Sequence, residues 1–369
     1  MKPLILLIFL FYFVLPAEER KKWEFETSSG KFLEVDMSTQ YDISVTGWDK
    51  NTILVEADIE EGDEDEESIH FRHSNGNLKI SSGFVDHGGS ELNIRVPVKF
   101  DLDLATMGGD IRIENIEGAI EGKTMGGDLE FFDLNGSIEF TTMGGDIDVH
   151  NSIISGELKT MGGDLDFDGV YGTLKGSTMG GDVTSRSTKK DIPEKKAGEL
   201  QLSTMGGDIM VDSAPLGVSV NTMGGDIDIR QAGKFVKSTT MGGDVMINAV
   251  DGSIKASTMG GEVNATMVGD PGKGERDVNL SSMGGDIYLT VPAGLSIEFD
   301  IILTYTKHGD REYSIKSDFP IKIEESDSWD YSQGSPKKYI FGTGQVAGGK
   351  NRIKIETING DIVIKKGSN

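Results

Sequence analysis

Cysteine is absent from this chain of 369 residues. Disulfide bonds, thiolate metal sites and a cysteine nucleophile are therefore excluded. Basic residues are scarce, because 36 Lys and Arg stand against 61 Asp and Glu and leave a formal net charge of −25. A chain this acidic is unsuited to binding nucleic-acid phosphates or an anionic membrane surface, and a metal cation or a basic partner fits it better.

Long apolar runs are missing everywhere except at the N-terminus. There, Lys2 precedes an apolar run from Leu4 to Leu15, and Pro16 and Ala17 end it before charged residues begin. This run is too short to span a bilayer, but its length is typical of the core of a signal peptide. We predict a signal peptide over residues 1–17 and an exported mature protein. An uncleaved anchor is the alternative.

Catalytic motifs are also missing. Neither G-x-S-x-G nor H-E-x-x-H occurs. An acid recurs at the same position in every repeat, whereas a polysaccharide-cleaving β-helix enzyme needs a single site with a nearby Arg or Lys. We predict that the protein is not an enzyme, and a polysaccharide-processing enzyme is kept as an alternative. The five histidines are scattered, at His70, His73, His87, His150 and His308.

One short motif is present many times. Met-Gly-Gly recurs mostly every 18 residues, with one interval of 26 and one of 24. A fixed period of this size indicates a repeat architecture. The two longer intervals place insertions at 185–197 and 268–277, which we expect to protrude as loops from one edge of the molecule. The motif begins at Met107, Met125, Met143, Met161, Met179, Met205, Met223, Met241, Met259 and Met283.

Apolar residues alternate within each repeat, as Ile111 with Ile113 and Ile147 with Val149 illustrate. Alternation of β-branched residues indicates strands, and one repeat cannot bury its apolar row without stacking on its neighbours. The prediction is an all-β fold, a parallel β-helix or solenoid of about ten 18-residue coils with β caps at both ends. We expect a right-handed coil, because parallel crossovers prefer that hand.

The predicted domain organisation follows from where the period begins and ends. Residues 23–369 are predicted to form a single solenoid domain after the signal peptide. Within it, residues 23–103 form N-terminal coils and a cap, residues 104–291 carry the regular repeats, and residues 292–369 form the C-terminal cap. The closing segment carries the repeat in altered form, as Thr-Ile-Asn-Gly-Asp over residues 357–361.

These altered residues suggest a role for each position of Thr-Met-Gly-Gly-Asp. Ile358 replaces Met, so we interpret Met as an apolar filler and disfavour a copper-binding methionine ladder. Asn359 replaces the first Gly and tolerates positive φ, so we predict that Gly-Gly forms a left-handed corner. Ser282 replaces Thr once and keeps the hydroxyl, which suits a bond to the turn backbone or to a neighbouring coil.

The acid of the motif is predicted to form a ladder along the coils. In register, its carboxylates repel by about 1 kcal/mol per pair in water and about 3 kcal/mol at an effective dielectric constant of 20. Two hypotheses remain: the acid caps turn amides, or the ladder binds Ca²⁺. One carboxylate per coil cannot fill six to eight Ca²⁺ positions alone. The candidate residues are Asp110, Asp128, Asp146, Asp164, Asp182, Asp208, Asp226, Asp244, Glu262 and Asp286.

Several segments together resemble a known family. They are "VTGWDKNTILVEA" (45–57), "LNIRVPVKFDLDLATMGGDI" (92–111), "VPAGLSIEFDI" (291–301) and "RIKIETINGDIVIKK" (352–366). The chain is similar to exported bacterial proteins of unknown function described as "putative adhesins", whose β-solenoid domains carry recurring T-x-x-G-D-I turns. The near-perfect Met-Gly-Gly run departs from the family, which repeats less regularly.

The resemblance implies a cell-envelope or surface protein with an adhesive or scaffold role, and it implies no catalytic residues. We therefore expect an exported structural or adhesive module, located in the periplasm, at the cell surface or outside the cell. Its expected partner is a surface protein or a glycan, and we expect no nucleic acid and no integral membrane segment once the signal peptide is removed. No cofactor is expected unless the acidic ladder holds Ca²⁺, and the Ca²⁺-stabilised solenoid is the alternative.

Overall fold

The computed structural model describes residues 21–57, 69–82, 90–186, 197–307, 312–332 and 334–367. The predicted signal peptide and most of the insertion at 185–197 lie outside these residues. The described residues form 32 β-strands and no helix, so none of them forms a membrane-spanning helix. The fold is an all-β solenoid, as the repeat period predicts.

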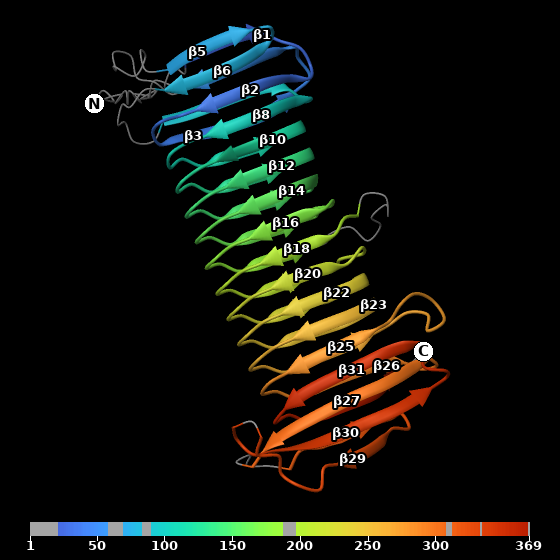
Figure 1. Cartoon of the computed structure of the whole chain (residues 1–369). Coiled ribbons are helices and arrows are strands. Elements are labelled where there is room, and N and C mark those ends of the chain that lie inside the picture. The colour runs from blue at the N-terminus through green and yellow to red at the C-terminus, as the bar shows by residue number, and fades with distance from the viewer. Residues whose placement is uncertain are drawn as a thin grey trace, which may run out of the picture.

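The N-terminal end consists of strands β1 to β8, most of which are labelled in Figure 1. β2 pairs in parallel with β8, and β3 pairs in parallel with both β7 and β9 (Ile111–Glu114), so both sheets of the solenoid begin here. β1 and β4 cover this end as an antiparallel pair, and β5 forms an antiparallel hairpin with β6. The strands are β1 (Lys21–Glu26), β2 (Lys31–Asp36), β3 (Tyr41–Trp48), β4 (Thr52–Ala57), β5 (Ile69–Ser74), β6 (Asn77–Ser82), β7 (Ser90–Pro97) and β8 (Phe100–Ala105).

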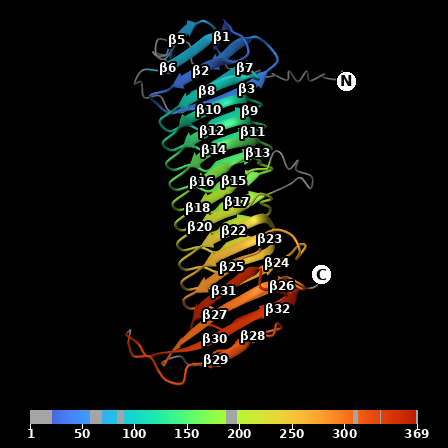
Figure 2. The same ribbon diagram turned by 45° about the vertical axis from the view of Figure 1, so that its right-hand side comes forward.

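Each repeat then contributes one strand to each of two parallel sheets (Figure 2). The sheet that continues from β8 contains β10 (Glu117–Lys123), β12 (Asn135–Thr141), β14 (Ile153–Lys159), β16 (Leu174–Ser177), β18 (Leu200–Ser203), β20 (Val218–Asn221), β22 (Ala232–Thr239) and β25 (Val278–Ser282). The sheet that continues from β3 contains β9 (Ile111–Glu114), β11 (Leu129–Phe132), β13 (Ile147–His150), β15 (Leu165–Asp168), β17 (Val183–Arg186), β19 (Ile209–Val211), β21 (Ile227–Ile229), β24 (Val263–Met267) and β26 (Ile287–Pro292). β23 (Val245–Ser257) contributes to both sheets.

The C-terminal end is completed out of sequence order. The last two strands pair in parallel with β25 and β26 and so form the next coil, as the altered repeat predicts. β27 then pairs with β31 on one side and with β30 on the other, which closes the solenoid with an antiparallel ribbon. The strands are β27 (Ile297–Thr306), β28 (Ile315–Ser317), β29 (Lys322–Glu325), β30 (Lys337–Val346), β31 (Asn351–Ile358) and β32 (Ile362–Gly367).

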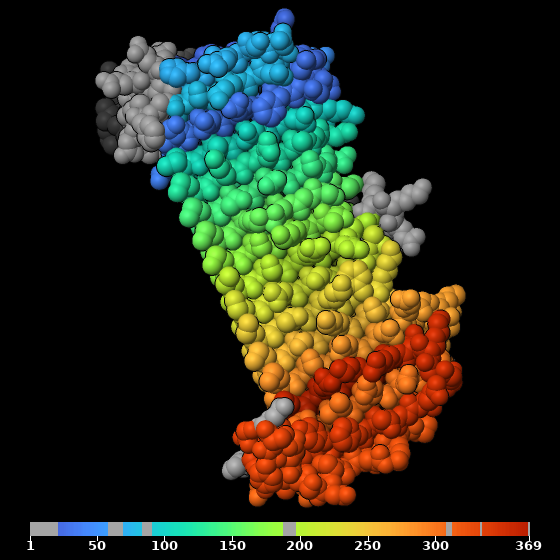
Figure 3. Space-filling view, in the orientation of Figure 1, coloured from blue at the N-terminus to red at the C-terminus, as the bar shows by residue number. Residues whose placement is uncertain are grey.

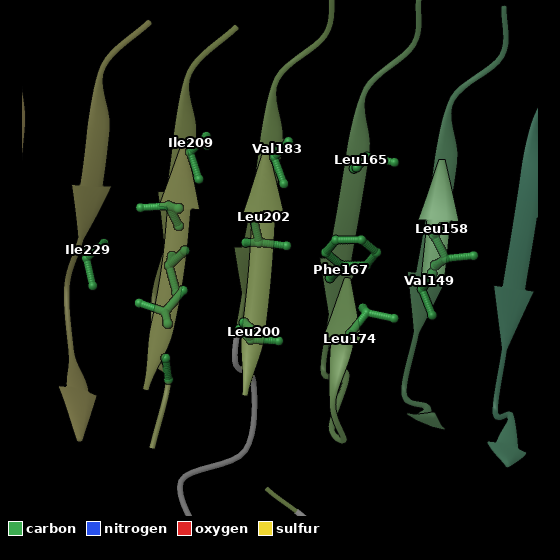
Figure 4. Close-up of a cluster of buried hydrophobic side chains, with 14 of the residues drawn as sticks. Val149, Leu158, Leu165, Phe167, Leu174, Val183, Leu200, Leu202, Ile209 and Ile229 are labelled. Carbon is green, nitrogen blue, oxygen red and sulfur yellow. The ribbon is translucent and has the colours of Figure 1, made fainter. Parts of the chain in front are cut away.

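The core is a set of apolar columns that run along the solenoid axis. Parallel register places Leu165 between Ile147 and Val183, and side chains from the two sheets meet inside the coil (Figure 4). At one level a glycine makes room for a large neighbour, because a Cβ on Gly122 would lie 2.6 Å from the Phe140 ring in the next coil. Burial of these columns is the main stabilising term, at roughly 25 cal/mol per Å² of apolar surface.

The insertion at 268–277 forms a loop on the edge opposite the repeated corner (Figure 1). Arg276 ties this loop down, because its side chain is only 2% exposed. Its guanidinium donates to the carbonyl oxygens of Val268 at 2.5 Å and Lys273 at 3.0 Å, and it pairs with the Asp251 carboxylate. The loop is therefore an ordered part of the solenoid wall.

Candidate functional site: the repeated corner

The repeated corner is the Thr-Met-Gly-Gly-Asp turn, which follows the strands of the sheet that continues from β8 (the first sheet) and forms the left edge of the molecule in Figure 1. Its threonine is buried and makes two hydrogen bonds. The Thr160 hydroxyl donates to the carbonyl oxygen of Gly145 in the preceding coil at 2.8 Å, and it accepts the Gly163 N–H of its own turn at 3.2 Å. The hydroxyl thus ties both the turn and the neighbouring coil, which confirms the role predicted from Ser282.

The threonine bonds lead to a stability prediction. Thr160→Val keeps the shape but leaves the Gly145 carbonyl and the Gly163 N–H without this partner. Unfolding free energy should fall by about 1–3 kcal/mol for each buried group left unpaired. Chemical denaturation measures this change. Thr160→Ser is the control, because Ser282 makes the same two bonds to Gly261 and Gly285, each at 2.8 Å. Equal stability of the Val variant and the wild type would contradict the prediction.

The second glycine of the corner is required by close packing of the backbone. A Cβ added to Gly163 would lie 2.2 Å from the carbonyl oxygen of Gly145, and the same approach recurs in every coil. A Cβ on Gly162 would lie 3.6 Å from its nearest neighbour. The second position therefore has no room for a side chain, and the first position has room.

The prediction of a left-handed Gly-Gly corner is wrong. Neither glycine of the Met-Gly-Gly turns has a φ in the left-handed region. Left-handed residues occur instead at the bend between the two strands of a coil, with φ of 58° at Asn115 and 50° at Asn151. Asn359 is left-handed, with φ of 56°, but it belongs to the closing coil, where its side chain accepts the Thr306 N–H from β27.

The acid of the motif links successive coils. The Asp146 carboxylate accepts the backbone N–H of Asp164 at 2.8 Å, and Asp164 does the same for Asp182 at 2.8 Å. Each of these two carboxylates thus accepts the backbone N–H of the corresponding acid in the next coil. The column begins at Asp42, which accepts the N–H of Asp110, and ends at Asp361, which accepts the N–H of Ser314.

All ten predicted acids lie in this column, one per coil. They are exposed, except that Asp286 is half-buried. Asp286 accepts the N–H of Asp361 at 2.7 Å, and Glu262 donates its own N–H to Asp244 at 2.7 Å. Among the residues that the structure describes, no three His, Asp or Glu side chains are grouped closely enough to hold a metal ion. Each coil thus gives the column a single carboxylate, and each of the nine predicted aspartates already accepts a backbone N–H through one oxygen.

The methionines of the corner are not fillers of the interior, so that interpretation is wrong. All ten side chains are between 41% and 54% exposed. Their backbones are held in register, since the Gly224 and Gly242 amides donate to the carbonyl oxygens of Met205 and Met223 in the preceding coils. They therefore form a continuous row, called here the methionine ridge. Ile358 is not an equivalent case, because its residue pairs with Thr304 of β27.

The sheet that continues from β3 (the second sheet) carries stacked carboxylates on its outer face, on the strands that follow this corner. Asp148 lies between Glu130 and Asp166 in register. Partial burial raises the pKa of Asp148, and the neighbouring Asp166 carboxylate raises it further. A raised pKa in the folded state means that the ionised form of Asp148 opposes folding.

A pH-dependent prediction follows. Asp148→Asn should increase unfolding free energy at pH 7, because it removes a charge that the folded state disfavours. The wild-type penalty is fully present above the folded pKa and vanishes as the pH falls below the ordinary Asp range. The gain should therefore shrink on acidification, as melting curves at pH 7 and pH 3.5 would measure. A gain that is constant with pH would indicate a packing effect instead.

Three solved structures illustrate what this chain is similar to. A "putative adhesin" from Bacteroides fragilis is 15% identical, with a TM-score of 0.36, over 65% of this chain and 98% of that one. A "putative adhesin" from Parabacteroides distasonis is 12% identical, with a TM-score of 0.36, over 74% and 97%. A "putative cell adhesion protein" from Clostridium sporogenes is 13% identical, with a TM-score of 0.18, over 95% and 100%.

No curated protein matches the chain. A family model does match it, over residues 16–290, which include the N-terminal strands and all ten Met-Gly-Gly turns. The family is described as Toastrack DUF4097, and this chain belongs to it.

Proposed function

We propose that the protein is an exported, non-enzymatic β-solenoid that serves as a structural or adhesive interaction module at the cell envelope. In this proposal a signal peptide over residues 1–17 directs export, and one domain over 23–369 winds about ten right-handed coils. The periplasm, the cell surface and the extracellular space are the compartments that fit. The expected partner is a surface protein or a glycan.

The methionine ridge is the observation that carries this proposal. A half-exposed side chain adds little to the core, so the fold itself does not need ten methionines at these positions. A continuous exposed apolar row marks an interaction surface, and flexible thioethers adapt to irregular partners. Figure 3 shows the surface that the stacked coils present over the length of the molecule.

The polar groups support a binding role over catalysis. His70 and His73 lie in β5 at the N-terminal end, whereas His150 lies in β13 and stacks on the Phe132 ring. An acid occupies the same position in every coil and all but Asp286 are exposed, which suits a structural column better than one reactive centre. Turnover of a surface polysaccharide by the purified protein would contradict this part of the proposal.

Binding to envelope fragments of the source cell tests the proposed function. The change replaces five alternate ridge residues by glutamine, at Met107, Met143, Met179, Met223 and Met259. Glutamine has a similar length but exposes a polar amide, so we expect binding to fall by about tenfold. Melting temperature should stay within a few degrees, because the ridge lies outside the core.

Pretreating the fragments identifies the class of partner. Loss of binding after protease digestion indicates a protein, and loss after periodate oxidation indicates a glycan. Undiminished binding by the five-site variant would overturn the role of the ridge. Absence of binding by the wild-type protein to any envelope fraction would overturn the adhesive role itself.

A further inference from the structure

The methionine ridge borders a groove near the N-terminal end of the solenoid. The groove encloses about 670 Å³. One wall consists of Met107, Met125 and Met143 from three successive coils. Four carboxylates also line the groove, and three of them, Asp103, Glu121 and Glu139, form one column across adjacent strands, called here the acidic wall. The acidic residues are Asp36, Asp103, Glu121 and Glu139.

Parallel register builds the acidic wall. Glu121 lies between Asp103 and Glu139 on adjacent strands, so their carboxylates are stacked at the strand spacing of about 4.8 Å. Burial raises the pKa of Asp103, and the nearby Glu34 carboxylate raises it further. Lys123 is the single basic residue among the described lining residues. The wall therefore carries an excess of negative charge that a bound cation would relieve.

The acidic wall ends after a few coils, although the ridge continues. On the same outer column, Glu157 is followed by Lys175, and later coils place Lys237 and Lys255 there. Glu157 is already paired with Lys159 and Lys175. Only the N-terminal coils therefore combine an apolar wall with an acidic one, and the same ridge lies beside basic residues further along.

We propose that this groove binds an extended polypeptide segment in which basic and apolar residues alternate. Side chains of a strand point alternately to opposite sides, so one set faces the carboxylates while the other contacts the thioethers. Three coils at about 4.8 Å provide length for about four extended residues at about 3.3 Å each. Methionine supplies adaptable apolar contact, and the carboxylates select positive charge.

This inference deepens the proposed function and rests on it, because it names the class of partner that one end of the scaffold recognises. The probe is a fluorescently labelled eight-residue peptide of alternating Lys and Leu, titrated with the full chain and followed by anisotropy. Peptides of alternating Glu and Leu and of alternating Lys and Ser are the comparisons. The Lys-Leu peptide should bind at least about tenfold more tightly than either comparison.

Two groups of variants locate the binding site. Met107→Gln/Met125→Gln/Met143→Gln should weaken Lys-Leu binding about tenfold, and Glu121→Gln/Glu139→Gln should weaken it and reduce its salt dependence. The matched control is Met223→Gln/Met241→Gln/Met259→Gln, which changes the same ridge beside the basic column. This control should leave affinity within about twofold, and melting curves show that all variants remain folded.

The outcomes separate this inference from the proposed function. Equal weakening by the two methionine triples, or no weakening by the groove variants, overturns the groove as the binding site. Equal binding of the three peptides overturns the proposed selection for alternating basic and apolar residues. If groove variants lose the peptide but keep envelope binding, the groove still binds such segments while adhesion uses another part of the ridge. If the wild-type protein binds the Lys-Leu peptide but no envelope fraction, the proposed function is overturned and the groove inference is not.

Discussion

Gly163→Ala should be among the most destabilising single substitutions in this solenoid. The added Cβ would lie 2.2 Å from the carbonyl oxygen of Gly145 and 2.5 Å from Oδ1 of Asp146, so neighbouring coils would have to separate. Separation breaks the bond from Thr160 to Gly145 and the bond from the Asp164 amide to Asp146. Overpacking costs about 1–3 kcal/mol, and loss of these bonds adds about 1 kcal/mol each.

Gly162→Ala is the matched control one residue away. Its Cβ would meet the Gly144 carbonyl oxygen at 3.6 Å, an ordinary contact, and its backbone is outside the left-handed region. Alanine there should be neutral or stabilise by a few tenths of a kcal/mol, because it restricts the unfolded chain. Urea denaturation of the two variants beside the wild type measures both effects. Equal costs at the two positions would show that the corner relaxes around a side chain.

Much of the fold is predictable from the sequence, because the repeat period of a β-solenoid determines which residues of successive coils are paired. The 18-residue interval gives the register, since Ile111, Leu129 and Ile147 are neighbours in the structure. Period-two alternation assigns these residues to the interior, where all are buried. The altered closing repeat also takes its place in the next coil. Membership of the Toastrack DUF4097 family confirms the resemblance that the T-x-x-G-D-I turns suggest.

The corner is less predictable, because alternation stops where the chain turns. The repeat period does not indicate whether the methionine side chain points inward or outward. A half-exposed apolar residue in the turn therefore cannot be distinguished from a buried one in the sequence. Glycine is equally ambiguous, since it serves both positive φ and close backbone approach. Asn359 favours the first explanation only because the closing coil is covered by β27, which changes the turn. The groove is formed by the methionine ridge and the acidic wall, which come from different parts of the coil, so no short sequence motif predicts it.

Added salt should stabilise the wild-type solenoid strongly. Exposed carboxylates of the acidic column stand one strand spacing apart, and each adjacent pair repels by about 1 kcal/mol in water. The Debye length falls from about 30 Å at 0.01 M to about 3 Å at 1 M, so salt screens this repulsion. Summed over the column, several kcal/mol of unfolding free energy should be gained between these concentrations. Melting temperature in NaCl gradients measures the gain.

Asp146→Asn/Asp164→Asn/Asp182→Asn isolates the contribution of the column. Asparagine keeps the Oδ1 acceptor for the next coil's amide but removes the charge. At low salt, the relief of repulsion and the weaker neutral hydrogen bonds are each worth about 1 kcal/mol per site, so the net change is small. The salt dependence should nevertheless become clearly shallower. An unchanged slope would mean that the charge effect arises elsewhere on this acidic chain.

Calcium should act on the column no more strongly than magnesium at the same concentration. A Ca²⁺ ion requires six to eight oxygen ligands, whereas each coil adds one carboxylate to the column, and the Oδ1 of aspartates such as Asp146 and Asp164 already accepts an amide N–H. A diffuse cation atmosphere can screen such a row without a defined site, and screening depends on ionic strength rather than on the identity of the ion. Melting curves in CaCl₂, MgCl₂ and NaCl at equal ionic strength, each with an EDTA control, distinguish the two cases. A rise specific to Ca²⁺, abolished by EDTA and by the triple Asn variant, would establish the ladder as a calcium site and replace the amide-capping role as its main purpose.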